Sequence, residues 1–238
     1  WMGNPRDPKT WTMAGPKLGL RYLSKELFAS ADVKSRFVYL SDGGHFENLG
    51  IYELVRRRCH LIIACDAEED AEMKFGGLGN AIQKCRADFG VDIDIDVKPI
   101  QKEKTEHYSR AHFALGDIRY SKVFPNAKDG KLLYMKSSLT KDIPAGVLSY
   151  AEQHKEFPHQ STADQWFDES QFESYRRLGE HICEDVHRDL SVAKDVDEWV
   201  GSLTRRWARV KGENEKYRVV NRLRVAVSAE AEAEGVKL

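Results

Sequence analysis

Asp42 is the residue whose type and setting point most directly to chemistry. It follows Phe37–Ser41, five residues that are mostly apolar and rich in β-branched or aromatic side chains, a composition typical of a short buried strand. Gly43 and Gly44 come next, and glycine adopts backbone angles closed to other residues. The pattern predicts a fixed base or orienting carboxylate at the carboxyl end of a strand, where two glycines let another loop approach closely. The alternative is a turn residue, because Asp accepts local backbone hydrogen bonds well.

A strand, a helix and a second strand are expected to position this carboxylate. The helix should begin with Asn48 as its N-cap and end with the three arginines at 56–58, whose charge suits the helix dipole. Leu61–Cys65 is a second apolar run, and it too ends on a carboxylate, that of Asp66. These elements predict a βαβ unit with a right-handed crossover, which brings the carboxyl ends of its strands to one functional edge.

Two segments carry a resemblance to a known family. Residues 41–50 read Ser-Asp-Gly-Gly-His-Phe-Glu-Asn-Leu-Gly, and the run Phe157–His181 forms the second segment. Together they resemble the patatin-like phospholipases over roughly residues 1–185, most of all the large bacterial branch related to the catalytic domains of cytosolic calcium-dependent phospholipases. The resemblance implies that Asp42 supplies the aspartate of a Ser-Asp dyad for hydrolysis of phospholipid or other acyl esters, a reaction of lipid degradation.

The resemblance also implies a fold and a set of supporting residues. We expect part of the patatin-like three-layer α/β fold, with a mixed and mainly parallel sheet flanked by helices over residues 1–187, and a helical extension over 188–238. Gly43, Gly44, His45 and Asn48 should support the loop around Asp42. The dyad requires no histidine, no metal and no cofactor, because the aspartate itself acts as base.

The nucleophilic serine of that family is not found in this sequence. Its elbow has the pattern Gly-x-Ser-x-Gly, which occurs nowhere among the 238 residues, and no glycine-rich run suits an oxyanion hole. We therefore expect the carboxyl-terminal portion of a longer enzyme, inactive alone, whose partners are an acyl-ester substrate and a missing amino-terminal portion. The alternative is a non-catalytic interaction module or pseudoenzyme on the same scaffold.

Composition excludes several other classes. Lys and Arg number 37 against 38 Asp and Glu, a net charge of −1, so no strong field draws the chain to nucleic acid. No apolar run approaches the ~18 residues of a spanning helix, and none resembles a signal peptide. We expect a cytoplasmic location, or peripheral contact with the cytoplasmic side of a membrane.

The four cysteines lack metal-ligand spacing and indicate free thiols, with Cys59 and Cys65 as small buried hydrophobes.

Other residues offer weaker chemistry. His112 is expected to be a hydrogen-bonded structural residue, whereas His45, three residues from Asp42, is the better candidate for a Ser-His-Asp triad. A metal hydrolase using His45, Glu47 and Asp66 is disfavoured, because these residues lack a recognised ligand spacing. Trp166 and Phe167 either belong to a helical core or line an acyl-chain channel.

Periodicity predicts the remaining elements. The expected helices are Leu18–Phe28, Leu78–Phe89 with Gly90 as C-cap, Pro144–His154, a long helix capped by Thr162 and Gln165, and two amphipathic helices over 196–210 and 213–227. The expected strands are Val91–Val97, Ala111–Tyr120 and Lys131–Lys136.

Overall fold

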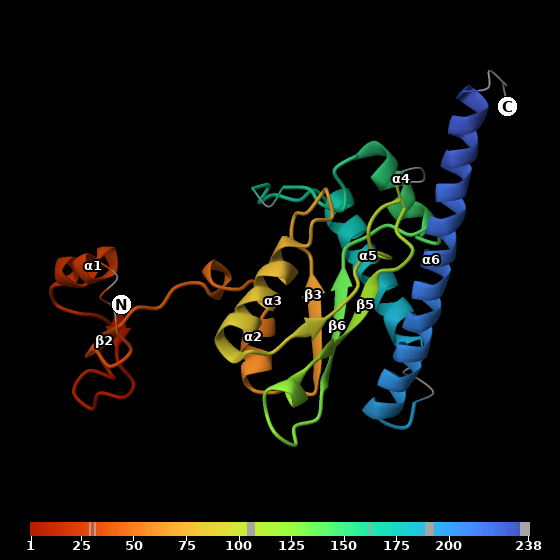
Figure 1. Cartoon of the computed structure of the whole chain (residues 1–238). Helices are drawn as coiled ribbons and strands as arrows, with labels where there is room; N and C mark the ends of the chain where they lie inside the picture. Colours follow the sequence, from red (N-terminus) through yellow and green to blue (C-terminus); the bar gives the residue numbers. More distant parts are fainter. Residues whose placement is uncertain (29, 31, 104–107, 162, 189–192, 234–238) are drawn as a thin grey trace. The chain divides into compact units, whose positions relative to one another are not determined.

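The chain forms two compact units, Trp1–Asn48 and Leu49–Leu238 (Figure 1). The computed structural model describes residues 1–238 apart from 29, 31, 104–107, 162, 189–192 and 234–238, and no side chains for 217, 218 and 220–233. The expected division of the sequence between residues 187 and 188 stays a prediction.

The first unit contains little regular structure. Strand β1 (Met2–Gly3) pairs antiparallel with β2 (Phe37–Val38), and between them lies helix α1 (Gly19–Leu27). The Asn4 side chain donates to the carbonyls of Val33 and Ser35 at 2.8 and 2.7 Å, which ties the two strand ends together. The short 3-10 helix η1 (Gly43–His45) follows.

The predicted βαβ unit is wrong in its first strand. β2 spans two residues of the five expected, and it belongs to a different sheet from β3 (Leu61–Asp66). A strand needs a neighbouring segment to satisfy its backbone groups, and among the described residues β1 pairs only with the beginning of this run. The helix, α2 (Ile51–Arg56), is also shorter than expected.

The second unit is built on a mixed four-stranded sheet in the order β3-β6-β5-β4. Its other strands are β6 (Gly130–Lys136), β5 (Phe113–Ile118) and β4 (Ile93–Asp94). β3 and β6 are parallel, whereas β6–β5 and β5–β4 are antiparallel. The expectation of a mainly parallel sheet is therefore wrong. Parallel neighbours need a long crossover, and the described residues that join β4, β5 and β6 include no α-helix.

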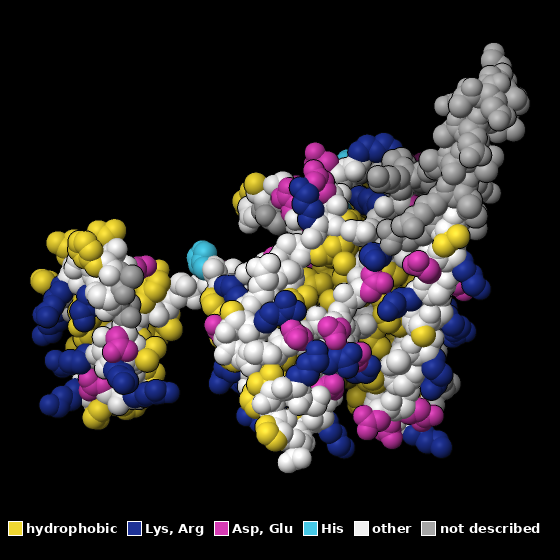
Figure 2. All heavy atoms as spheres, viewed as in Figure 1, with side chains coloured by type: hydrophobic (Ala, Val, Ile, Leu, Met, Phe, Trp, Pro, Cys, Tyr) yellow, Lys and Arg dark blue, Asp and Glu magenta, His cyan; other side chains and the backbone are white. Residues whose placement is uncertain are grey.

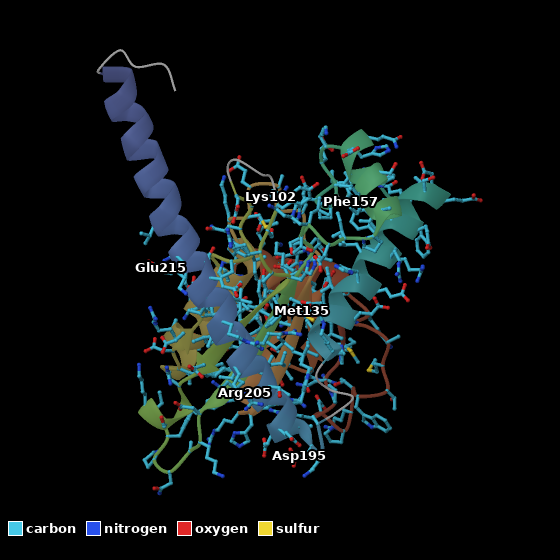
Figure 3. The ribbon with its side chains drawn as sticks, turned by 90° about the vertical axis from the view of Figure 1, so that its right-hand side faces the viewer. Lys102, Met135, Phe157, Asp195, Arg205 and Glu215 are labelled. Atoms are coloured by element: carbon cyan, nitrogen blue, oxygen red, sulfur yellow. The ribbon has the colours of Figure 1, made fainter. Side chains whose placement is uncertain are left out.

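Helices cover both faces of this sheet. α2 and α3 (Gly76–Phe89) lie on one face, and α5 (Glu169–His187) lies on the other (Figures 1 and 3). α4 (Ala145–Gln153) packs on α5. The long α6 (Val196–Ala233) packs on β5, where the rings of Trp207 and Phe113 lie 5.7 Å apart. The general α/β fold is as predicted.

Most of the predicted elements of the second unit are confirmed. α3 ends at Gly90, which adopts the left-handed conformation, and α4, β5 and β6 lie where periodicity placed them. The two C-terminal helices are instead one continuous helix, α6. The long helix α5 is capped by Asp168, whose Oδ1 accepts from Gln171 N at 2.7 Å; Thr162 of the expected cap lies outside the described residues.

Two further expectations concern burial and membranes. All four cysteines are free thiols, but Cys65 is exposed and Cys59 is partly buried. Cys65 is exposed because alternate residues of β3 face opposite sides of the sheet, and Ile62 and Ala64 take the buried side. Within the described residues, the helices include none with the length and apolar character that crossing a membrane requires.

Candidate functional site

Asp42 lies in an exposed turn of the first unit. It precedes η1 as the N-cap, and its Oδ1 accepts a hydrogen bond from Gly44 N at 2.9 Å. Among the described residues, no hydrogen bond or ion pair engages the other oxygen, Oδ2. Asp42 is thus a turn-forming carboxylate, as in the alternative interpretation. The expectation that it directly follows a strand is wrong, because β2 ends at Val38 and belongs to the two-stranded sheet.

Gly44 occupies a position at which the neighbouring Asn48 leaves no room for a side chain. A Cβ atom at this position would lie 2.7 Å from Asn48 Oδ1, which is too close for a real contact. Asn48 therefore packs against the turn, as expected of a residue that holds the loop, but it is not the N-cap of α2. Gly50, with a φ of 72°, takes that position. Neither Gly43 nor Gly44 has a positive φ, so unusual backbone angles are not the reason for this glycine pair.

His45 does not form a triad with Asp42 in the described turn. Its backbone N donates to the Asp42 carbonyl at 3.2 Å, and its side chain is exposed. No hydrogen bond joins its ring to the Asp42 carboxylate, although both groups are described. Glu47, which follows the turn, is buried.

A second group of polar side chains lies at the carboxyl ends of the parallel strands β3 and β6. Asp66 and Lys136 are register partners, and Lys136 Nζ lies 3.0 Å from Asp66 Oδ1 with both side chains about 1% exposed. Tyr134 donates its hydroxyl to Asp66 Oδ2. Burial, and then the bond to Asp66, raises the pKa of Tyr134. The carboxylate thus accepts bonds at both oxygens, and it is not available as the metal ligand considered with His45 and Glu47.

Three more ionisable groups surround this ion pair. Asp70 Oδ2 lies 3.6 Å from Lys136 Nζ. Burial lowers the pKa of Lys102, which Asp70 opposes. His159 is 3% exposed, and neither ring nitrogen has a hydrogen-bond partner among the described residues. Figure 3 shows Lys102 and Phe157 at one end of the unit, beyond Met135 of β6, and Asp195 at the other end.

The Asp66–Lys136 group is best explained as a structural ion pair. A buried charge is costly unless it is paired and hydrogen-bonded, and Asp66 gains a third bond from Glu68 N at 2.9 Å. Sequence reasoning noticed Asp66 at a strand end but missed Lys136, Tyr134 and His159. The signal for Lys136 was its place at the end of an otherwise apolar strand.

Open hollows occur elsewhere on the second unit. One, of about 640 Å³, lies between α4 and α5 and is lined by side chains that include Tyr150, His154 and Arg177. Trp166 is 90% exposed and precedes α5, so it belongs neither to a helical core nor to this hollow. His112 is buried, and its ring nitrogens lie within hydrogen-bonding distance of two hydroxyls, Ser138 Oγ at 3.0 Å and Thr140 Oγ1 at 2.9 Å.

Comparison with known proteins adds no assignment. No protein-family model, no curated protein and no solved structure matches the chain.

Proposed function

We propose that this chain is part of a serine acyl hydrolase of the patatin-like kind and supplies Asp42 as the base of a Ser-Asp dyad. The serine and the oxyanion hole are contributed by sequence outside the 238 residues. The substrate class is phospholipid or another acyl ester. The observation that carries the proposal is the exposed Asp42 carboxylate, fixed through Oδ1 and open at Oδ2.

The geometry supports a defined role for each oxygen. The Gly44 N–H bond to Oδ1 orients the carboxylate, so that Oδ2 can accept the proton of the serine hydroxyl as its oxygen attacks the ester carbonyl. Asp42 passes this proton to the departing alcohol, then takes a proton from the water that hydrolyses the acyl-enzyme and returns it to the serine oxygen as the acid leaves. Gly44 permits the tight packing of Asn48 against this turn, which keeps the carboxylate in place.

A non-catalytic interaction module is the second candidate, and α1 is the observation that favours it. Leu20, Leu23 and Leu27 of this helix are all exposed, and none of its residues is buried. Figure 2 shows hydrophobic side chains gathered over this part of the first unit. An exposed apolar patch is typical of a contact surface, and a pseudoenzyme would keep such a surface without turnover.

The decisive experiment replaces Asp42 by Asn in the enzyme that joins this chain to its serine-bearing portion. The amide oxygen of Asn can keep the Gly44 bond but cannot act as a base. We expect kcat for a chromogenic ester to fall by about 10²–10⁴-fold, with an unchanged thermal midpoint.

Asp32→Asn is the matched control, because Asp32 is exposed in the same unit and its Oδ1 accepts from Lys34 N at 3.1 Å in a turn of the same kind. The control should keep full activity. Near-normal turnover by Asp42→Asn, or hydrolysis by the 238-residue chain that a fluorophosphonate blocks at one of its own serines, would refute the assignment.

A further inference from the structure

Three ionisable side chains from separate segments converge inside the second unit, away from the Asp42 turn. His112 precedes β5, Asp142 lies between β6 and α4, and His181 lies on α5. One ligand atom from each lies within 4.8 Å of the others. His181 Nε2 is 3.8 Å from Asp142 Oδ1, and the two imidazole rings are nearly perpendicular with centroids 5.3 Å apart.

The hydrogen bonds of the Ser138 hydroxyl bear on which ring nitrogen of His112 carries a lone pair. Ser138 Oγ donates to the Ala111 carbonyl at 3.3 Å, so its single proton is used there. In the tautomer that fits this bond, Nδ1–H donates the 3.0 Å contact to Ser138 Oγ. A neutral imidazole carries one proton, so in this tautomer His112 Nε2 is an acceptor with a lone pair available to a metal ion.

Nε2 of His112 competes for a proton with Asp142. Thr140 Oγ1 lies 2.9 Å from Nε2 and 2.6 Å from Asp142 Oδ1. A threonine hydroxyl has one proton, so it can satisfy only one of these two acceptors at a time. His181 is the third member of the cluster. Its Nε2 atom is buried and also has no hydrogen-bond partner among the described residues.

We propose that His112, Asp142 and His181 form a binding site for a divalent transition-metal ion, of which Zn²⁺ fits best. Two imidazole nitrogens and one carboxylate oxygen are a common ligand set for Zn²⁺, with metal–ligand distances of about 2.0–2.2 Å. A single cation could bind His112 Nε2, Asp142 Oδ1 and His181 Nε2 together, whereas the one Thr140 proton can be donated to only one acceptor. Such bond lengths bring tetrahedral ligand atoms to about 3.4 Å apart, and the exposed Asp142 side chain can make most of that adjustment.

The surroundings of the cluster resemble those of known metal sites in two respects. A ligating histidine normally donates its other N–H to a fixed acceptor, which Ser138 provides for His112. Three protein ligands also leave a fourth position for water. A hollow of about 310 Å³ reaches the cluster through Thr140 and Asp142, with Arg110 also on its wall. The bound metal would therefore be accessible to solvent.

The test titrates the metal-free 238-residue chain with Zn²⁺ against a chromophoric chelator, and with Co²⁺ monitored by its visible absorption. We expect one tight site with a spectrum that lacks thiolate charge transfer. Asp142→Ala and His181→Gln should each weaken Zn²⁺ binding by more than ~100-fold, since loss of a ligand exceeds the 10–100-fold cost of losing an outer partner. Ser138→Ala removes such an outer partner and should weaken binding by about 10–100-fold.

Two controls separate this site from adventitious binding. His60 is exposed in the same unit, and His60→Gln should leave the affinity unchanged. Cys65 and Cys183 are both exposed thiols that could hold Zn²⁺ by themselves, and the double change to Ser should also leave it unchanged. The proposal is overturned if the wild-type chain binds no stoichiometric metal, if the cysteine variant abolishes binding, or if Asp142→Ala and His181→Gln bind as wild type while circular dichroism shows them folded.

Discussion

The two units differ most clearly in what their helices bury. In α3 of the second unit, Leu78 is 2% exposed and packs in the core, whereas Leu20 of α1 in the first unit is 77% exposed. The second unit also buries a complete ion pair, Asp66–Lys136. The first unit pairs two strands of two residues each and has no buried residue in its helix.

This difference teaches that the proposed chemistry and the stability of the chain are carried by separate parts. Asp42 stands on the unit with the small core, held by a local turn. Stability at the level of a folded domain comes from burial of apolar area, and that burial is concentrated in the second unit. Substitutions should therefore fall into two groups, those that change unfolding and those that change turnover.

The largest expected effect on stability comes from Lys136→Met. It leaves the buried Asp66 carboxylate without its cation, and breaking a buried pair costs about 3–5 kcal/mol in the free energy of unfolding. Chemical denaturation of the chain, monitored by tryptophan fluorescence, measures the loss; Trp199 and Trp207 are buried in this unit.

The double change Asp66→Asn with Lys136→Met tests the physical reason. Removing both charges is less costly than removing one, so the double variant should be more stable than Lys136→Met alone. Equal losses in the two variants would show that packing, and not the uncompensated charge, sets the cost.

A pair of identical substitutions sharpens the comparison of the helices. Leu78→Ala creates a cavity in the core and should lower the free energy of unfolding by about 2–5 kcal/mol. Leu20→Ala removes an exposed side chain and should change it by no more than about 0.5 kcal/mol. Differential scanning calorimetry of both variants checks this. A loss from Leu20→Ala as large as that from Leu78→Ala would mean that α1 is covered in solution, and the contrast between the units would fail.

Local patterns in the sequence predicted most elements of the second unit. α3 and α4 have helical periodicity, and the positions of β5 and β6 follow from their apolar runs. The start of α5 was misplaced because two capping patterns compete, and Asp168, directly before the helix, is the one that is used. Pattern reasoning failed for the βαβ unit because an apolar run does not say which segment will pair with it.

The candidate sites show the same limit. Asp42 and its turn lie within one short segment, so the residues around it were visible in the sequence as one motif, and the resemblance implied their roles. The Asp66–Lys136 pair joins residues 70 positions apart, and its formation depends on the β3–β6 register. The His112, Asp142 and His181 cluster needs three separate segments to meet, and no motif records that meeting.

An effect smaller than those of Lys136→Met and Leu78→Ala is expected when the pH is lowered. Burial, and then the neighbouring charges of Lys102 and Lys136, lowers the pKa of His159 to about 4, while the backbone of Glu68 and the charge of Asp70 act in the opposite direction. The unfolded chain, with a histidine pKa of about 6.5, binds this proton more readily than the folded chain between pH 4 and 6.5. Stability is therefore complete above pH 6.5 and decreases as the pH falls toward 4.

His159→Phe isolates this contribution, because it removes the titrating imidazole and keeps an aromatic ring at a position that is 3% exposed. Relative to this variant, the wild type should lose about 1–3 kcal/mol of unfolding free energy between pH 6.5 and 4, measured by urea denaturation at each pH. The imidazole signal of His159 in a nuclear magnetic resonance titration should move with a midpoint near 4. A midpoint near 6.5, with parallel stability curves for the two proteins, would show that this histidine is hydrated, and that the second unit is less tightly packed at the sheet end than its buried ion pair implies.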